Sequence, residues 1–385
     1  MGLKEKLTAC LEQAVANKEA AGMSVLAVRK GQELAYAQAG MANIAAQKPI
    51  ARDSIFRLYS QSKPITAAAV MILLDRGILD EQDGADRWLP GFRDPKVIHE
   101  DGSVTAAPRA PWVGELLAMT GGLCYPDQDP AGQAAARVFE KDQELIRAGG
   151  GMTTLEFCNE LGKQPLAFQP GTHWRYSTCA DILGAIVEAA SGMHFGEFLE
   201  QEIFEPLGMK DTGFWVLPEK QERLVTAYAR TAGGLEEYHG LHLAVGAYDR
   251  APAFESGGAG LVSTLDDYMA FAQMLMNGGK YHGKRILSEA AVRHMTGAQL
   301  TPALQRELWD NLSGYNYGHL MRVCDHPSAL PHFGEKHEYG WDGWLGTYFI
   351  NLPESETTML FFQNVKDSGT CGATRRCRNI LAAAL

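Results

Sequence analysis

The sequence predicts an α+β fold in which both ends of the chain build one central antiparallel sheet. Two pairs of short β-prone runs lie near the chain ends, residues 23–30 with 33–40 and residues 346–352 with 357–364. A helical pattern over residues 1–20 precedes the first pair, and another over residues 373–385 follows the second. Runs of this kind around a short turn form hairpins, and the apolar face of a sheet must be covered. We therefore expect the two terminal helices to flank the sheet.

Residues 77–250 differ from the two ends, because they carry many Gly, Pro and Asp turn signals and no clear strand alternation. Helical segments are predicted at residues 153–161, 180–190 and 195–204. We expect two domains: a discontinuous α/β domain (1–76 and 251–385) and a mostly helical domain (77–250), with the active site at their junction.

A glycine-rich stretch, SGGAGLVST at residues 256–264, follows the helical region. Ser263 or Thr264 is suited to cap the next predicted helix, residues 265–277. No P-loop lysine pattern accompanies the glycines, so the stretch is interpreted as a tight turn that leads into a helix.

Composition narrows the functional classes. The 385 residues are 46% hydrophobic and 21% charged, with a net charge of −11. An acidic chain is a poor partner for nucleic acids and for anionic membrane surfaces. Residues 1–20 have no continuous apolar core and no window is long enough for a membrane span, so we expect a cytoplasmic protein that acts on small molecules.

The cysteines indicate neither a metal cluster nor a disulfide framework. There are seven, widely spaced and without a C-x-x-C pair. Reduced thiols in a cytoplasmic protein explain them. We expect no metal and no organic cofactor, and the sequence does not predict the oligomeric state.

The strongest chemical signal is Ser60-Gln61-Ser62-Lys63 at the start of a wholly apolar helical run. Residues three apart share a helical face, so the Ser60 hydroxyl and the Lys63 amine can meet. Serine needs a neighbouring base to act as a nucleophile, and burial would lower the pKa of Lys63 enough to make it one. Pro64 suits the helix start and Gly77 its end. Alone, the motif is compatible with catalysis or with an ordinary helix N-terminus.

A second motif, PGTHWRYST at residues 170–178, favours catalysis over an ordinary helix N-terminus. Together with Ser60-x-x-Lys63 it resembles the serine β-lactamase and penicillin-binding-protein superfamily, in particular class C β-lactamases and family VIII carboxylesterases. Further fragments match in order and spacing along nearly the whole chain: residues 56–60, 116–123, 205–209 and 256–264. The resemblance implies a β-lactamase/transpeptidase-like fold.

The resemblance also implies roles. Ser60 would be acylated, Lys63 would activate it, and Tyr176 would shuttle the proton as general acid and base. Thr178 stands where the family pattern has asparagine and would line the substrate site with fewer hydrogen-bonding options.

The family's third motif, Lys-Thr-Gly or His-Thr-Gly, is replaced by Trp341-Asp342-Gly343-Trp344. A tryptophan at the first position resembles the family VIII esterases. Gly343 would let the strand approach the substrate closely, and the main-chain N–H groups of Ser60 and Trp344 would form the oxyanion hole. Trp341 and Trp344, with Tyr125 and Trp215, are candidate pocket aromatics.

Asp342 bears on the substrate. β-Lactams and peptides ending in D-alanine carry a carboxylate, and like charges ~4 Å apart repel by about 4 kcal/mol at an effective dielectric constant of ~20. Such substrates would be disfavoured unless Asp342 points away or pairs with a cation, for which Arg322, Lys336 and His337 are candidates.

The sequence thus favours a serine hydrolase that forms an acyl-enzyme through Ser60, with a carboxylesterase of small esters first. A D-amino-acid amidase or aminopeptidase, or an acyltransferase, is the main alternative. A β-lactamase or DD-carboxypeptidase ranks lower, and a non-catalytic binding protein ranks last because Ser60, Lys63 and Tyr176 are all present.

Overall fold

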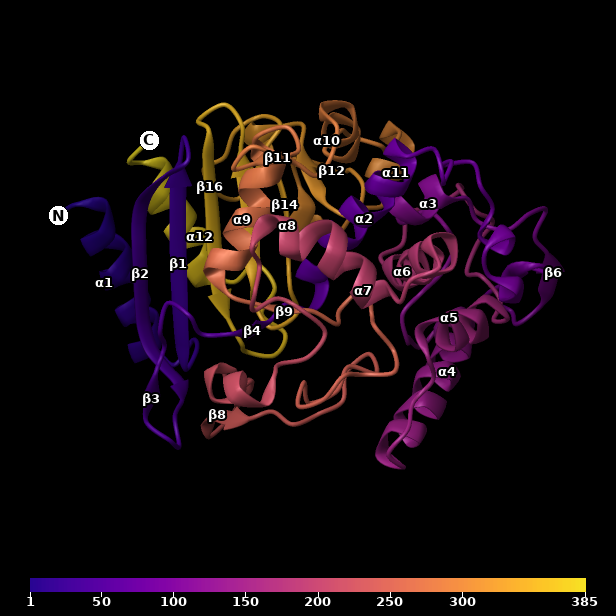
Figure 1. Ribbon diagram of the computed structural model, residues 1–385, viewed down its shortest axis with the longest axis horizontal. Helices are drawn as coiled ribbons and strands as arrows, with labels where there is room; N and C mark the ends of the chain where they lie inside the picture. The colour runs from indigo at the N-terminus through magenta and orange to yellow at the C-terminus, as the bar shows by residue number, and fades with distance from the viewer.

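The computed structural model describes residues 1–385 and is built around one eight-stranded antiparallel sheet (Figure 1). The strand order is β12-β13-β14-β15-β16-β1-β2-β3, so strands from the two chain ends meet where β1 pairs with β16. The strands of this sheet are β1 (Gly22–Arg29), β2 (Gln32–Asn43), β3 (Lys48–Pro49), β12 (Tyr315–Tyr317), β13 (Arg322–Cys324), β14 (Tyr339–Asp342), β15 (Tyr348–Leu352) and β16 (Thr357–Gln363). Both predicted hairpins are confirmed, whereas β12 and β13 carried no recognisable signal because each is three residues long.

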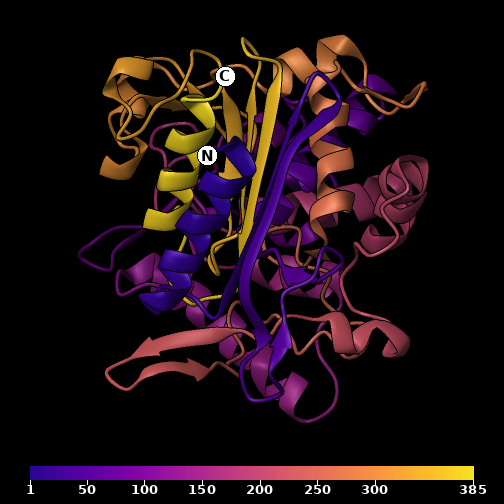
Figure 2. The ribbon, with the colours of Figure 1, turned by 90° about the vertical axis from the view of Figure 1, so that its left-hand side faces the viewer.

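The two terminal helices, α1 (Leu3–Ala16) and α12 (Gly372–Ala382), cover one face of the sheet, as predicted (Figure 2). Side chains alternate between the faces of a strand. In β16 Met359 and Phe361 therefore pack under the terminal helices, while Leu360 and Phe362 face the larger core on the other side. The helix α9 (Leu265–Met276) lies against β15 and β16 on that second face.

The helix that follows Ser60, α2 (Lys63–Asp75), lies inside the larger core. Every residue from Lys63 to Leu73 is buried, and α2 packs against α6 (Cys179–Ser191) and α10 (Glu289–Met295). Pro64 stands in its first turn, and Gly77 beyond its end has a φ of +67°, which glycine adopts without steric penalty. The predicted start and stop of this helix are confirmed.

Residues 77–250 are rich in helices and long connections. The remaining helices of the chain are α3 (Val113–Leu117), α4 (Pro130–Arg147), α5 (Thr154–Gly162), α7 (Phe195–Leu199), α8 (Glu205–Leu207) and α11 (Pro302–Gln305), with a π-helical turn at Glu200–Phe204 and 3-10 turns at Tyr59–Ser62, Ala85–Arg87, Pro90–Phe92, Pro218–Arg223, Asp310–Leu312 and Pro327–Ala329. The predicted helices at residues 153–161 and 180–190 match α5 and α6, and residues 195–204 match α7 and the π-helical turn.

Residues 77–250, predicted to be mostly helical, also contain short strands. Two small hairpins lie there, β5 (Lys96–Ile98) with β6 (Val104–Ala106) and β7 (Tyr228–Thr231) with β8 (Gly234–Glu237). Strands of three or four residues are too short to show alternation in sequence. The other short pairs are β4 (Phe56–Arg57) with β9 (Val262–Ser263) and β10 (Lys280–Tyr281) with β11 (Lys284–Arg285). The division into two domains stays a prediction.

Membrane insertion through a helix has no support in the structure. None of the helices combines the length and the apolar character needed to cross a bilayer. The longest of those given above, α4, is amphipathic, with polar and charged residues along one side.

Candidate active site

The backbone around Ser60 is held from both sides. Ser60 lies in the 3-10 turn Tyr59–Ser62, which leads directly into α2. Leu58 N–H donates to the Leu261 carbonyl at 2.9 Å, and Leu261 N–H donates to Ser62 Oγ at 3.1 Å. Tyr59 has a φ of +46°, a conformation that a non-glycine residue keeps only where its surroundings enforce it. The position of the Ser60 hydroxyl is thus fixed by tertiary contacts as well as by the turn.

Lys63 meets Ser60 as the spacing predicts. Its Nζ lies 3.1 Å from Ser60 Oγ, 2.8 Å from the Gly258 carbonyl oxygen and 3.0 Å from Tyr125 Oη. A neutral amine has two N–H donors and one lone pair. It can therefore donate to Gly258 and Tyr125 while its lone pair accepts the Ser60 proton. This coordination suits a lysine that acts as a base.

Burial also favours the neutral form of Lys63. The side chain is completely buried, which lowers its pKa to about 7. The carboxylate of Asp181 opposes that shift, because a negative charge nearby stabilises the ammonium form. A change from 10.5 to about 7 corresponds to about 5 kcal/mol against charging the amine. At neutral pH roughly half of the molecules therefore hold a neutral Lys63.

Tyr176 completes the group around Ser60. The indole Nε1–H of Trp341 donates to its hydroxyl at 3.0 Å, and Lys63 Nζ lies 4.6 Å from its ring centroid. Burial raises the pKa of Tyr176, although hydrogen bonds from Ser60 and Trp341 oppose the increase. Tyr176 is therefore protonated in the resting protein, and Lys63 is the stronger candidate for the base that first activates Ser60.

The segment after β14 lies beside Ser60. Thr347 Oγ1 donates to the Leu58 carbonyl at 3.0 Å, and the ring of Trp344 lies 5.0 Å from that of Tyr59. A Cβ on Gly343 would come within 2.1 Å of the same Leu58 oxygen. The approach to the backbone before Ser60 therefore requires a glycine here, and the approach of this strand to substrate stays a prediction. The main-chain N–H of Trp344 donates to no other group of the protein and is free to bind an oxyanion.

The other predicted substrate residues have different outcomes. Thr178 has no exposed surface, and its hydroxyl lies 3.5 Å from the Cys124 carbonyl, so a direct contact with substrate is not supported. Asp342 pairs with Arg322, Nη1 to Oδ2 at 2.9 Å, and also accepts from Thr370. The structure thus selects Arg322 over Lys336 and His337, and the paired carboxylate loses most of the predicted repulsion towards anionic substrates.

Three groups near Lys63 were not predicted as site residues. Tyr125 was only a candidate pocket aromatic, and the glycine-rich turn was explained without function, yet the Gly258 carbonyl contacts Lys63. Asp181 holds that turn, since its Oδ1 accepts from Ser256 Oγ at 2.5 Å and from Gly258 N–H at 3.0 Å. Of these three groups, only Asp181 could have been recognised in the sequence, because an aspartate within an apolar helical pattern is unusual.

Aromatic rings stand on both sides of the Ser60 group. Tyr176 packs against Trp309 at 5.0 Å and Trp341 at 5.5 Å between ring centroids. Trp344 packs against Tyr59 and stacks on His242, at 3.9 Å between ring centroids. Trp309 is half exposed, so the first of these walls reaches the surface.

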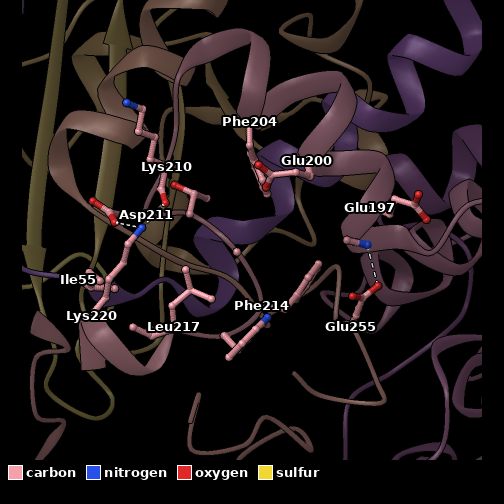
Figure 3. A pocket seen from close by; sticks show the side chains of 15 residues that line it. Ile55, Glu197, Glu200, Phe204, Lys210, Asp211, Phe214, Leu217, Lys220 and Glu255 are labelled. Carbon is pink, nitrogen blue, oxygen red and sulfur yellow. Dashed lines mark hydrogen bonds and ion pairs between the residues drawn. The ribbon is translucent and has the colours of Figure 1, made fainter. Parts of the chain in front are cut away.

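Trp215, a candidate pocket aromatic, does not lie beside the Ser60 group. It lines a cavity of about 400 Å³ that contains neither Ser60 nor Lys63 nor Tyr176 (Figure 3). Two of the interactions drawn there are Lys220 with Asp211 at 2.8 Å, and Gly196 N–H donating to Glu255 at 2.7 Å. This cavity offers no group of catalytic residues comparable to the one around Ser60.

Comparison with known proteins agrees with this geometry. A model of the Beta-lactamase family matches residues 7–384. Esterase EstB of Burkholderia gladioli is 31% identical over 360 residues, covering 90% of this chain and 86% of the esterase. Protein Rv1367c of Mycobacterium tuberculosis is 31% identical over 334 residues, covering 84% and 80%. Among solved structures, EstCE1, described as a hydrolase with promiscuous acyltransferase activity, superposes with a TM-score of 0.82 at 24% identity, covering 99% of this chain and 98% of EstCE1.

Proposed function

This chain belongs to the beta-lactamase family of serine hydrolases, and we propose that it is a carboxylesterase that cleaves small esters through an acyl-enzyme on Ser60. The observation that carries the proposal is the contact of Ser60 Oγ with a fully buried lysine amine at 3.1 Å. A serine hydroxyl needs such a base, and a buried lysine with a pKa of about 7 is half neutral at neutral pH.

In the proposed acylation step Lys63 takes the Ser60 proton as Oγ attacks the ester carbonyl. The carbonyl oxygen becomes an oxyanion that accepts from the main-chain N–H groups of Ser60 and Trp344. Tyr176 gives its hydroxyl proton to the departing alkoxide, and Lys63 returns a proton to Tyr176. Water then attacks the acyl-enzyme, and the proton transfers run in reverse to release the acid and restore Ser60.

The residues beside Tyr176 support an ester in preference to a carboxylated substrate. Trp341, a neutral side chain, occupies the position where the family pattern has a cation, and it donates its hydrogen bond to Tyr176. Arg322 is buried and already paired with Asp342. Neither Trp341 on β14 nor Arg322 on β13 therefore offers an unpaired positive charge to a substrate carboxylate. These contacts disfavour the β-lactamase and DD-carboxypeptidase alternatives.

Acyl transfer to an alcohol is the second candidate. The aromatic walls formed by Trp309 with Tyr176 and by Trp344 with His242 flank the Ser60 group. Apolar rings bind an organic alcohol better than they bind water, so an alcohol can compete for the acyl-enzyme. EstCE1, whose description includes acyltransferase activity, shares the fold. Adding a primary alcohol to the ester assay and measuring the new ester tests this candidate.

The cysteines support a cytoplasmic location. All seven are free thiols, and five of them are buried. Free thiols persist in a reducing compartment.

The test is intact-mass spectrometry of the wild-type protein and the Ser60→Ala variant after incubation with p-nitrophenyl acetate or butyrate and, separately, with a penicillin. We expect an acyl adduct or turnover with the esters that requires Ser60, and no lasting penicillin adduct. Undiminished ester turnover by Ser60→Ala would overturn the mechanism. A stable penicillin adduct on Ser60 would move the protein to the penicillin-binding branch of the family.

A further inference from the structure

Two histidines and a glutamate converge at the end of α2 opposite the Ser60 group. Glu81 lies in the turn after α2, His294 lies on α10, and His319 lies between β12 and β13. Each residue offers one ligand atom, and these atoms all lie within 4.8 Å of one another. The three positions are far apart in the sequence, and α10 packs on α2 (Figure 1). The fold alone brings them together.

We propose that Glu81, His294 and His319 form a site for a divalent transition-metal ion, with zinc as the first candidate. Two imidazole nitrogens and one carboxylate oxygen are a ligand set that zinc uses in proteins, with water in the remaining position. Neutral imidazole and carboxylate also suit other first-row metals of similar size. The site is separate from the serine chemistry and does not depend on the proposed function.

The distances fit coordination. Glu81 Oε1 lies 2.7 Å from His294 Nε2 and 3.6 Å from His319 Nε2. At zinc–ligand distances of about 2.0–2.1 Å, neighbouring ligands on a tetrahedral ion lie about 3.4 Å apart. The 3.6 Å separation from His319 is already close to this value, whereas the 2.7 Å contact with His294 is a hydrogen bond that would have to lengthen. His294 is half exposed, so its ring has room to adjust and the fourth position is open to water.

His319 is the feature that an ordinary ion pair leaves unexplained. Its side chain is 2% exposed, and its Nδ1 has no hydrogen-bond partner in the protein. The 3.6 Å from Nε2 to Glu81 is too long for a hydrogen bond. Buried polar groups are nearly always partnered. A metal ion on Nε2 would bind this nitrogen, which makes no hydrogen bond to Glu81, and would explain why the ring stands beside His294, at 4.6 Å between ring centroids; Nδ1 would still have no partner.

The segments joined by this site indicate what the metal would do. Glu81 follows α2, which carries Lys63 at its other end, and His319 stands three residues before Arg322 on β13. A metal ion bound by three segments of the folded chain stabilises the folded state, because the unfolded chain does not hold the ligands together. We therefore assign the site a structural role that ties α10 and the β12–β13 connection to the turn after α2.

The experiment uses the full chain without an affinity tag, stripped of metal with a chelator. Zn²⁺ binding is measured by isothermal titration calorimetry, and Co²⁺ binding by visible absorption, which reports tetrahedral coordination. The test variant is His294→Gln, chosen because the His294 side chain is half exposed and its replacement leaves the core intact, with Glu81→Gln as a second variant. The matched control is His239→Gln, because His239 also lies near a glutamate, 3.3 Å from Glu237, but has no third ligand.

We expect one Zn²⁺ per chain, a Tm that rises with Zn²⁺, and a loss of affinity on the order of a hundredfold in His294→Gln but not in His239→Gln. The proposal is overturned if the wild type shows no saturable binding at micromolar Zn²⁺. It is equally overturned if His294→Gln binds as tightly as the wild type, which would place the metal elsewhere, for example on the half-buried thiol of Cys10.

Discussion

Replacing Asp181 by asparagine should move the acid limb of the pH–activity profile to lower pH. Lys63 must be neutral to accept the Ser60 proton, so kcat/KM should rise with pH and reach half of its plateau at about 7. Below that midpoint the neutral fraction falls about tenfold per pH unit, which predicts about a hundredfold loss at pH 5. The Asp181 carboxylate raises the pKa of Lys63, so removing its charge should lower the midpoint.

Asparagine is the informative replacement at this position. Asp181 Oδ1 accepts from Ser256 Oγ and from Gly258 N–H, and the amide oxygen of asparagine can keep both hydrogen bonds. The turn whose Gly258 carbonyl contacts Lys63 should therefore stay in place while the charge is lost. Relative to its own plateau, the variant should be more active than the wild type on the acid side. Each unit of downward shift gives about a tenfold gain at a fixed acidic pH.

The assay is kcat/KM for p-nitrophenyl acetate from pH 5 to 9, followed at a wavelength where p-nitrophenol and its anion absorb equally. Asp142→Asn is the control, because Asp142 is buried and accepts from Met152 N–H but does not influence the pKa of Lys63. A wild-type profile with no acid limb between pH 6 and 8 would refute Lys63 as the base. An unchanged midpoint in Asp181→Asn would refute the electrostatic coupling.

The remaining predictions concern the residues around the same group. Tyr176→Phe should lower kcat/KM by ~10²–10⁴-fold through loss of proton transfer, whereas Trp341→Phe, which removes one hydrogen bond, should lower it by about tenfold; equal losses would contradict the assigned roles. Asp342→Thr leaves Arg322 unpaired and should improve hydrolysis of carboxylated esters, with a loss of roughly 3–5 kcal/mol in the free energy of unfolding. Adding Arg322→Met should abolish this improvement. If the double variant still hydrolyses carboxylated esters faster than the wild type, Arg322 is not the cause. Lys63 has a lower pKa in the folded than in the unfolded chain, so the unfolded chain binds more protons above pH 7. The free energy of unfolding of the wild type, measured relative to Lys63→Met in urea titrations, should therefore rise by about 2 kcal/mol from pH 7 to pH 9. A constant difference would show that the Lys63 pKa is not depressed.

Local spacing and periodicity determined much of this protein. The β-prone runs around short turns near the chain ends predicted β1, β2, β15 and β16, because strand propensity and turn residues are local properties of the sequence. The Ser60–Lys63 contact followed from three-residue spacing in one helical turn, and the apolar run after Lys63 predicted the burial that lowers its pKa. Such features need only neighbours in sequence.

Tertiary structure decided which distant groups reach those local features. The Gly258 carbonyl, 195 residues from Lys63, and the Trp341 indole, 165 residues from Tyr176, become hydrogen-bond partners only when the chain folds. The choice of Arg322 as the partner of Asp342 was open among three cations in the sequence, and the register of β13 against β14 settled it. Glu81, His294 and His319 showed no ligand spacing at all. A side chain's charge and partners depend on the groups within a few ångströms of it, and packing determines those groups.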